Sequence, residues 1–347
     1  MKTSQWIVDK DVNEENDYPQ IIQAAEMLKE NEVVAFPTET VYGLGANAKS
    51  TEAVNKIFSA KGRPSDNPLI VHIGATEQLE NLVAHISEKA KKLINQFWPG
   101  PLTIIFEKKE GVFSDKVTAG LNSVGIRLPD HPVAMALIKE ANLPIAAPSA
   151  NRSGRPSPTT AKHVLDDLDG SIAGIVDGGS TGVGVESTVI DCTADVPMIL
   201  RPGGISKEEI EAVIGPVDMD ATLVTGEGAP KSPGMKYTHY APNAPLFLVD
   251  GNPEYLQSIV KEKQSEGLKV GVLATEETNG FYEADMVIPC GRRDDLKTVA
   301  HDLYDVLRAF NEEKLDLILS EAFPRNGIGV AVMNRLEKAA GHRWIGK

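Results

Sequence analysis

Residues 61–73, "KGRPSDNPLIVHI", set the pattern of the chain: a helix ends, a stiff loop follows, and a strand begins. The preceding residues 51–62, "TEAVNKIFSAKG", carry apolar residues at helical spacing, and Gly62 is of the type that ends helices. Two prolines restrict the loop, and "PLIVHI" is a short apolar run typical of a strand. This helix, loop and strand unit predicts an α/β fold.

Strand and helix patterns alternate around this unit over residues 1–215. Further strands are predicted in the segments "EVVAFPTE", "PLTIIFEK", "SVGIRLP", "AGIVDGG", "ESTVIDC" and "MILRPGG". Helices are predicted at 18–31, 87–97, 132–141, 159–168 and 206–214. Because strands outnumber helices, we expect an α/β domain built on a large, twisted, mixed sheet.

The rhythm changes in residues 245–347, where short apolar strands alternate with helices. Strands are predicted at 245–250, 269–275, 285–291 and 315–323, with helices at 253–266, 293–311 and 328–340. Continuous apolar strands between helices are typical of a small parallel, Rossmann-like sheet. The sequence therefore predicts a second, smaller domain.

Residues 216–244 are rich in Gly, Pro, Asp and Thr and are predicted to be a linker. Its segment "KSPGMKYTHYAPNAP" carries Lys236, Tyr237, His239 and Tyr240 between prolines. A passive tether rarely needs aromatic or ionisable side chains. Two interpretations stay open: a stiff hinge, or a segment that folds toward the active site.

Composition limits the possible functions. The 347 residues carry a formal charge of −14, which argues against nucleic-acid binding as the main activity. No run of some 18 apolar residues and no signal-peptide pattern are visible, so we expect a cytoplasmic protein without membrane association. Cys192 and Cys290 are too few for a disulfide framework and are predicted to be buried.

Common catalytic signatures are missing, including the P-loop, the G-x-S-x-G elbow, H-E-x-x-H and CxxC. Polar clusters at strand ends are present instead. Lys61 and Arg63 lie on the proline-stiffened loop and suit phosphate oxygens, although a solvated basic turn is the alternative. Arg127 and Arg201 each close a strand beside a proline and suit a carboxylate or phosphate, although an ion pair with an acid such as Asp130 is nearly as plausible.

Two further loops are ambiguous. "APSANRSGRPSP" (147–158) interleaves hydroxyl and amide side chains that can cradle phosphate, ribose or a carboxylate. It equally fits a surface loop before a helix capped by Thr159 or Thr160. "GGSTGVGVEST" (178–188) is more typical of a tight turn between strands.

Seven segments taken in order resemble the YrdC-type domain of L-threonylcarbamoyladenylate synthases. They are "FPTETVYGLG", "KGRPSDNPLIVHI", "WPGPLTIIF", "VGIRLPDHP", "APSANRSG", "ESTVID" and "ILRPGGIS", and they cover most of residues 20–210. "SPGMKYTHYAP" with the Rossmann-like domain after it resembles the long, two-domain bacterial and archaeal form. The resemblance implies an enzyme that joins L-threonine, bicarbonate or CO2, and ATP into L-threonylcarbamoyl-AMP and pyrophosphate.

The resemblance also implies the residues of the site. Those expected around L-threonine are Thr40, His72, Arg127, Ala147 through its backbone, and Ser187. Those expected around ATP are Lys61, Arg63, Asn67, Ser123, Ser149, Asn151, Ser157, Arg201 and Tyr240. Mg²⁺ is expected to enter with ATP, held by phosphate oxygens and water rather than by a protein metal site.

The expected partner is a separate transferase complex that receives the product and makes N6-threonylcarbamoyladenosine in tRNA, so direct tRNA binding should be weak. Two alternatives use the same domain: an RNA-binding module, and a carbamoyl-transferring maturation factor. The latter resembles longer chains with acylphosphatase and CxxC modules, which are missing here. A regulatory or assembly role is a third possibility for residues 245–347.

Overall fold

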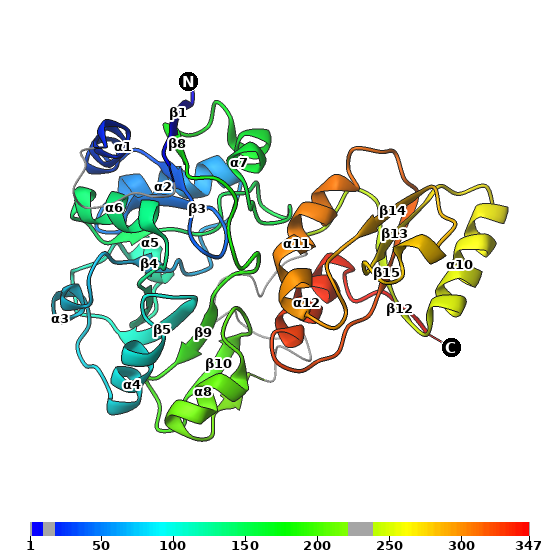
Figure 1. Cartoon of the computed structure of the whole chain (residues 1–347). Coiled ribbons are helices and arrows are strands. Elements are labelled where there is room, and N and C mark those ends of the chain that lie inside the picture. Colours follow the sequence, from blue (N-terminus) through cyan, green and yellow to red (C-terminus); the bar gives the residue numbers. More distant parts are fainter. Residues whose placement is uncertain (1, 10–17, 221–238, 347) are drawn as a thin grey trace. The chain divides into compact units, whose positions relative to one another are not determined.

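The computed structural model describes residues 2–9, 18–220 and 239–346 (Figure 1). Contacts divide the chain into two compact units, one made mainly of residues before 220 and the other mainly of residues from 239 onward. The short segments Gly154–Ser157 and Val183–Val185 group with the second unit. Most of the predicted linker, including Lys236 and Tyr237, lies outside the described residues.

The first unit contains one eleven-stranded mixed sheet in the order β1-β8-β2-β3-β7-β4-β6-β5-β9-β10-β11. Its strands are β1 (Ser4–Ile7), β2 (Val34–Phe36), β3 (Gly43–Asn47), β4 (Val71–His72), β5 (Leu102–Glu107), β6 (Ser123–Arg127), β7 (Ile145–Ala146), β8 (Gly174–Asp177), β9 (Thr188–Asp191), β10 (Met198–Arg201) and β11 (Asp218–Met219). Parallel and antiparallel neighbours are both present: β4 runs parallel to β6, and β5 runs antiparallel to it. The predicted large mixed sheet is confirmed.

Several strand bounds differ from the prediction. β4 covers two residues rather than the six of "PLIVHI", because Pro68 has no N–H to donate and the Leu69 N–H donates to Val117 outside the sheet (2.8 Å). β1, β3, β7 and β11 were not predicted, since they are short or glycine-containing. β11 lies within the stretch predicted as linker and pairs with β10.

Helices of the first unit begin and end where capping residues allow. They are α1 (Pro19–Lys29), α2 (Thr51–Lys61), α3 (Leu79–Leu82), α4 (Glu88–Phe97), α5 (Asp115–Thr118), α6 (Pro132–Ala141), α7 (Ala161–Leu168) and α8 (Lys207–Ile214), with a 3-10 turn, η1 (Thr76–Gln78). Gly62 ends α2 in the left-handed conformation, at a φ of 60°. Thr160 caps α7 through its hydroxyl, so this helix begins two residues after the predicted start.

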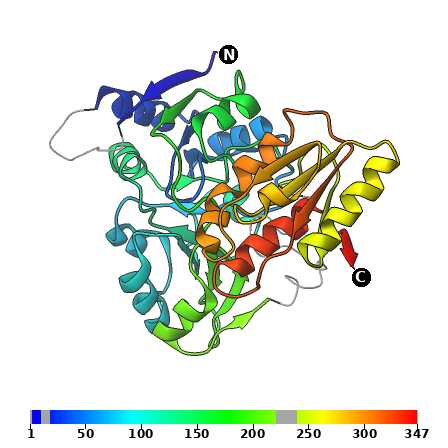
Figure 2. The same ribbon diagram turned by 45° about the vertical axis from the view of Figure 1, so that its right-hand side comes forward.

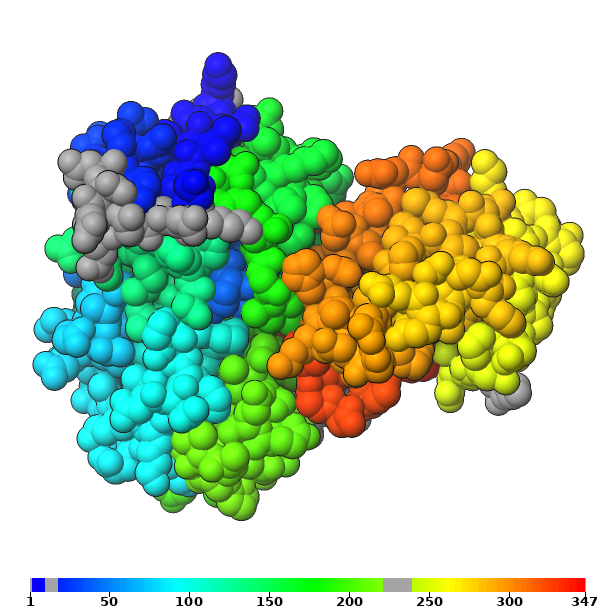
Figure 3. All heavy atoms as spheres, in the orientation of Figure 1, coloured from blue at the N-terminus to red at the C-terminus, as the bar shows by residue number. Residues whose placement is uncertain are grey.

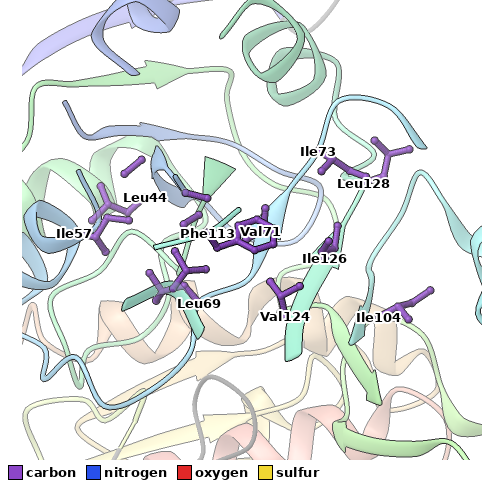
Figure 4. Close-up of a cluster of buried hydrophobic side chains, with 14 of the residues drawn as sticks. Leu44, Ile57, Leu69, Val71, Ile73, Ile104, Phe113, Val124, Ile126 and Leu128 are labelled. Atoms are coloured by element: carbon purple, nitrogen blue, oxygen red, sulfur yellow. The ribbon is translucent and has the colours of Figure 1, made fainter. Parts of the chain in front are cut away.

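Hydrophobic side chains divide between the two faces of the sheet. Alternate residues of adjacent strands, such as Val71 in β4 and Val124 and Ile126 in β6, enter one core cluster (Figure 4). Helices α2, α4, α5, α7 and α8 contribute to this cluster, and α4 and α8 lie side by side (Figure 3, cyan and yellow-green). A second cluster on the other face joins Val34, Phe36 and Ile145 to α1 and α6.

The second unit contains a five-stranded parallel sheet in the order β14-β13-β15-β12-β16. Its strands are β12 (Leu246–Asp250), β13 (Val270–Ala274), β14 (Met286–Pro289), β15 (Leu317–Glu321) and β16 (Trp344–Gly346). The connecting helices are α10 (Pro253–Ser265), α11 (Leu296–Ala309) and α12 (Gly329–Ala339), with a 3-10 turn, η2 (Asn279–Phe281). The chain moves one way through β12, β13 and β14 and returns through β15 and β16.

Because crossovers between parallel strands are right-handed, this reversal places α10 on one face of the sheet and α11 and α12 on the other (Figures 1 and 2). The predicted smaller Rossmann-like sheet is therefore confirmed, with β16 as an unpredicted edge strand. Both cysteines are free and buried, as predicted, and burial raises the pKa of the Cys192 thiol to about 12. Over the described ranges, every helix is too short or too polar to cross a membrane.

The packing around β3 gives a test of the fold. A Cβ on Gly45 would lie 2.7 Å from Cε1 of Phe36 and 2.9 Å from Cγ2 of Ile145, two fully buried side chains. Gly45→Ala should therefore destabilise the first unit by about 1–3 kcal/mol through overpacking, measured as a lower urea midpoint. Gly280→Ala is the control, since nothing lies within 4 Å of its added Cβ. Equal midpoints for the two variants would contradict this packing.

Candidate active site

Polar side chains gather on one face of the first unit's sheet, over strands β4, β5, β6 and β9. In β6, Val124 and Ile126 enter the core, so Ser123, Gly125 and Arg127 lie on the opposite face. That is the face which α1 and α6 cover over β2, β7 and β8. Next to β7 in the sheet, β4 and β6 carry the predicted residues His72, Ser123 and Arg127 on this same face.

Arg127 lies at the end of β6 and is only 3% exposed. Its Nη1 donates to Oγ1 of Thr40 (2.9 Å), and its Nε donates to the Gly100 carbonyl (3.3 Å). Its Nη2 forms an ion pair with Glu39. The alternative of an ion pair with an acid is therefore confirmed for Arg127, but the acid is Glu39 from the turn between β2 and β3 and not the exposed Asp130.

That turn, "PTETVY", is fixed from several sides. Thr38 Oγ1 lies 2.8 Å from Oγ1 of Thr40 and donates to the Val41 carbonyl (2.8 Å). The Tyr42 hydroxyl donates to the Gly179 carbonyl (2.7 Å), and its backbone N–H donates to Pro158. The glycine-rich stretch around Gly179 thus acts as a turn that supports the site.

His72 lies on β4 directly across from Arg127 on β6 and is 3% exposed. Its ring meets Phe36 edge-on, with centroids 6.2 Å apart. Burial, followed by the charge of Arg127, lowers the pKa of His72 to about 3. The imidazole is therefore neutral at physiological pH.

Arg201 and Ser187 form a second buried pair. Nε of Arg201 donates to the Ser187 carbonyl and Nη2 to its Oγ, both at 3.1 Å. Oγ1 of Thr103 on β5 lies 2.8 Å from Oγ of Ser187. Arg201 is 5% exposed, and a bulge between Ile199 and Arg201 in β10 interrupts the register beside β9. A bulge of this kind re-aims the side chain that follows it.

Lys61 is the third buried cation, at 2% exposed. Its Nζ donates to the carbonyls of Ser149 (2.5 Å) and Asn151 (2.7 Å). Ser149 Oγ donates to Oδ1 of Asn151 (2.6 Å), which ties the two predicted segments together. Burial, followed by the charge of Arg63, lowers the pKa of Lys61, and Asp167 and Glu186 oppose this effect. For Lys61, the alternative of a solvated turn is wrong.

Next to these cations the sheet face becomes apolar. A pocket there is lined by Pro68, Leu69, Ile70, Ile105, Leu121, Ser123, Gly125 and Val189. Gly125 keeps it open, since a Cβ there would lie 3.2 Å from Cγ2 of Thr103. Asn67 is buried just before the pocket, Arg63 is half-buried, and the Ala147 N–H donates to Ile70 (2.9 Å).

Ser157 and Tyr240 belong to the second unit. Tyr240 is 4% exposed and adopts a φ of 66°, which is rare for a bulky residue. Its ring lies 5.0 Å from that of Tyr304 and 6.0 Å from the Arg335 guanidinium. These two predicted residues therefore lie outside the first unit.

Within the first unit, contacts join the predicted residues into three groups. They are Thr40, His72 and Arg127; Lys61, Ser149 and Asn151; and Ser187 with Arg201. Sequence reasoning missed Thr38, Glu39 and Thr103. The alternation of apolar residues in "SVGIR" was the available sequence signal for a polar face of the strand. The ion pair between Glu39 and Arg127 joins residues 88 positions apart, so no local sequence pattern indicates it.

Comparisons with known proteins cover both units. A family model described as telomere recombination matches residues 26–203, and one described as threonylcarbamoyl-AMP synthase, C-terminal domain, matches residues 205–341. Threonylcarbamoyl-AMP synthase of Bacillus subtilis (strain 168) is 62% identical over 345 residues, covering 99% of this chain and 100% of that protein. The protein of the same name from Pyrococcus abyssi is 48% identical over 327 residues, covering 93% and 94%. The crystal structure of P. abyssi Sua5 complexed with L-threonine superposes with a TM-score of 0.92 at 46% identity, covering 99% and 100%.

The low pKa of His72 predicts a pH-dependent contribution to stability. The pKa is about 3 in the folded chain against an ordinary 6.5, so the unfolded state binds more protons between these values. The contribution is fully present above about pH 6.5 and is lost as pH falls toward 3. In the wild type, His72 should lower the free energy of unfolding by about 2 kcal/mol as the pH falls from 7 to 5. The variant His72→Asn should lack this decrease. His85→Asn, at an exposed histidine of the same unit, is the control variant. An unchanged slope in His72→Asn would contradict the burial argument.

Proposed function

The chain belongs to the threonylcarbamoyl-AMP synthase family, and we propose that it joins L-threonine, CO2 or bicarbonate, and ATP into L-threonylcarbamoyl-AMP and pyrophosphate. The observation that carries this proposal is a group of buried polar atoms whose bonding capacity is not filled. Among the described residues, Nδ1 of His72 and Oε2 of Glu39 have no hydrogen-bond partner, and Nη2 of Arg127 and Oε1 of Glu39 meet only each other as an ion pair. Buried polar groups normally have hydrogen-bond partners, so such a cluster favours a polar ligand.

We assign the amino-acid end of the site to this cluster. P. abyssi Sua5 has been crystallised with L-threonine. In this chain we assign Thr40, His72, Arg127, Ser187 and the Ala147 backbone to that substrate, as the motif resemblance implies. An arginine fork suits a carboxylate, and a neutral imidazole suits a hydroxyl group. A polar contact to the hydroxyl and a close methyl pocket would distinguish threonine from valine and serine.

The nucleotide end is assigned to the remaining cations and the apolar pocket. Lys61, Arg63 and Arg201 supply positive charge for the phosphates. The apolar pocket beside Ser123 and Asn67 suits a flat base. The resemblance adds Ser149 and Asn151 of the same unit. Backbone carbonyls hold Lys61 and Arg201, which keeps these two cations in position before ATP binds.

Mg²⁺ would enter with ATP and neutralise polyphosphate charge. Within the described residues, no group of three or more His, Cys, Asp or Glu side chains is placed to hold a metal. The proposal therefore gives the ion mainly phosphate oxygens and water as ligands.

The chemistry proceeds in two steps. The threonine ammonium loses two protons as its nitrogen adds to CO2 and forms a carbamate. A carbamate oxygen then attacks the α-phosphorus of ATP, and pyrophosphate leaves with the electrons of the broken P–O bond. A free carbamate is short-lived in water. A buried site that aligns it with the phosphate should therefore contribute more to the reaction rate than a strong acid or base would.

The product would pass to a separate transferase complex that modifies tRNA, and no direct tRNA binding is required. The test of the proposal is incubation of the chain with ATP, bicarbonate and L-threonine, followed by mass detection of threonylcarbamoyl-AMP. Omitting each substrate in turn should abolish the product. Product formation without L-threonine, or none with the full mixture, would overturn the proposal.

Two cations of the nucleotide end give a residue-level test. Arg63→Ala and Arg201→Ala should each lower threonine-dependent pyrophosphate release about 100-fold or more, because each removes charge stabilisation of the phosphates. Arg152→Ala is the control, since this exposed arginine lies in the same loop region and is not assigned to the site. Circular dichroism should show all three folded. Wild-type turnover in a site variant would remove that residue from the assignment.

A further inference from the structure

Glu39 belongs to the amino-acid end of the site, but no group of the substrate is yet assigned to it. It lies between Thr38 and Thr40 in the turn after β2, with its side chain 12% exposed and ion-paired to Arg127. Oε1 meets Nη2 of Arg127 in that ion pair, and Oε2 has no hydrogen-bond partner among the described residues. A nearly buried carboxylate that only meets a cation retains acceptor capacity, which favours a ligand with N–H donors.

The hydroxyl groups beside Glu39 have fixed directions. Thr38 donates its hydroxyl hydrogen to the Val41 carbonyl, so its oxygen accepts from Thr40. Thr40 thereby spends its only hydrogen on Thr38, and its oxygen accepts from Nη1 of Arg127. Toward a ligand, Thr40 therefore offers a lone pair and no donor. Glu39 and Thr40 together form an acceptor surface beside the donor fork of Arg127.

The charges of this group match those of a free amino acid. Arg127 carries one positive charge, Glu39 one negative charge, and His72 is neutral at physiological pH. The sum is zero, as it is for an amino-acid zwitterion. Without Glu39, the α-ammonium group would enter a site whose nearest charge is the Arg127 guanidinium, and like charges in a buried site repel strongly.

We propose that Glu39 and Thr40 receive the α-ammonium group of the amino-acid substrate, and that Glu39 makes the pocket select an α-amino acid over the same acid without an amine. This inference rests on the proposed function, because Arg127 is taken to bind the substrate carboxylate. Glu39 is thus a specificity-determining residue that also presents the nitrogen which reacts with CO2.

A purely structural role for Glu39 makes a different prediction. If Glu39 only holds Arg127 in place, its loss weakens every ligand that binds through a carboxylate, with or without an amine. If Glu39 binds the ammonium group, its loss weakens only the ligand that has one. Comparing how the loss of Glu39 changes the affinity for a ligand with an amine and for one without therefore distinguishes ammonium binding from a structural role.

The experiment uses the full chain in CO2-free buffer with a non-hydrolysable α,β-methylene analogue of ATP. Calorimetry measures the Kd of L-threonine and of 3-hydroxybutanoate, which keeps the carboxylate and hydroxyl and lacks the amine. The variants are Glu39→Gln, which keeps the shape, Glu39→Asp, which keeps the charge, and Glu32→Gln as the control. Glu32 is an ion-paired glutamate of the same unit, bonded to Lys56 away from the site (2.8 Å).

The wild type and Glu32→Gln should bind L-threonine about tenfold or more tighter than 3-hydroxybutanoate, as expected for hydrogen bonds to a charged group. In Glu39→Gln this preference should fall to about threefold or less, and Glu39→Asp should restore part of it. Equal weakening of both ligands in Glu39→Gln, with the preference intact, would overturn the inference and leave the proposed function standing. Absence of L-threonine binding in the wild type would instead overturn the proposed function.

Discussion

The burial of positive charge is the constraint on which the first unit depends. Lys61, Arg127 and Arg201 are each at most 5% exposed, and removing such groups from water costs several kcal/mol unless polar partners replace it. The chain offsets this cost differently in each case: two backbone carbonyls face Lys61, an acid and a threonine face Arg127, and the two oxygens of Ser187 face Arg201. The partners also hold each cation in one position, so the ligand meets a site that is already ordered.

The sheet makes this arrangement possible because it separates the two kinds of surface by alternation. In β6 the residues at odd positions face the site, and the even ones fill the core beneath it. A slip of one residue would exchange the two sets and place Arg127 in the apolar core. Stability and site geometry therefore depend on the same register, in which His72 pairs with Arg127 and Ile104 with Ile126.

The sequence predicted best those features that depend on interactions between residues close together in the chain. Helix bounds were predicted closely, because caps such as Ser206 and Thr160 act within three residues. The large mixed sheet and the small parallel sheet followed from apolar runs, whereas β4 is shorter than its apolar run and β7, of two residues, offers no pattern. The sequence led to Arg127 but not to its partner, since Glu39 approaches it only after β2 and β6 take their places in the sheet. The motif resemblance located residues that propensity alone would have left in loops.

The negative surface charge and the buried cations of the site act over different distances. This difference explains how an acidic chain can accommodate an anionic nucleotide. The formal charge of −14 spreads over a surface where salt screens interactions beyond about 8 Å at physiological ionic strength. The three cations of the site are nearly excluded from solvent and are screened far less. An extended polyanion such as tRNA meets many surface charges at once, whereas a nucleotide that fits the site meets mainly the buried ones. The same charge distribution therefore disfavours the large anion and favours the small one, in keeping with the proposal that the chain makes an adenylate and does not itself bind tRNA.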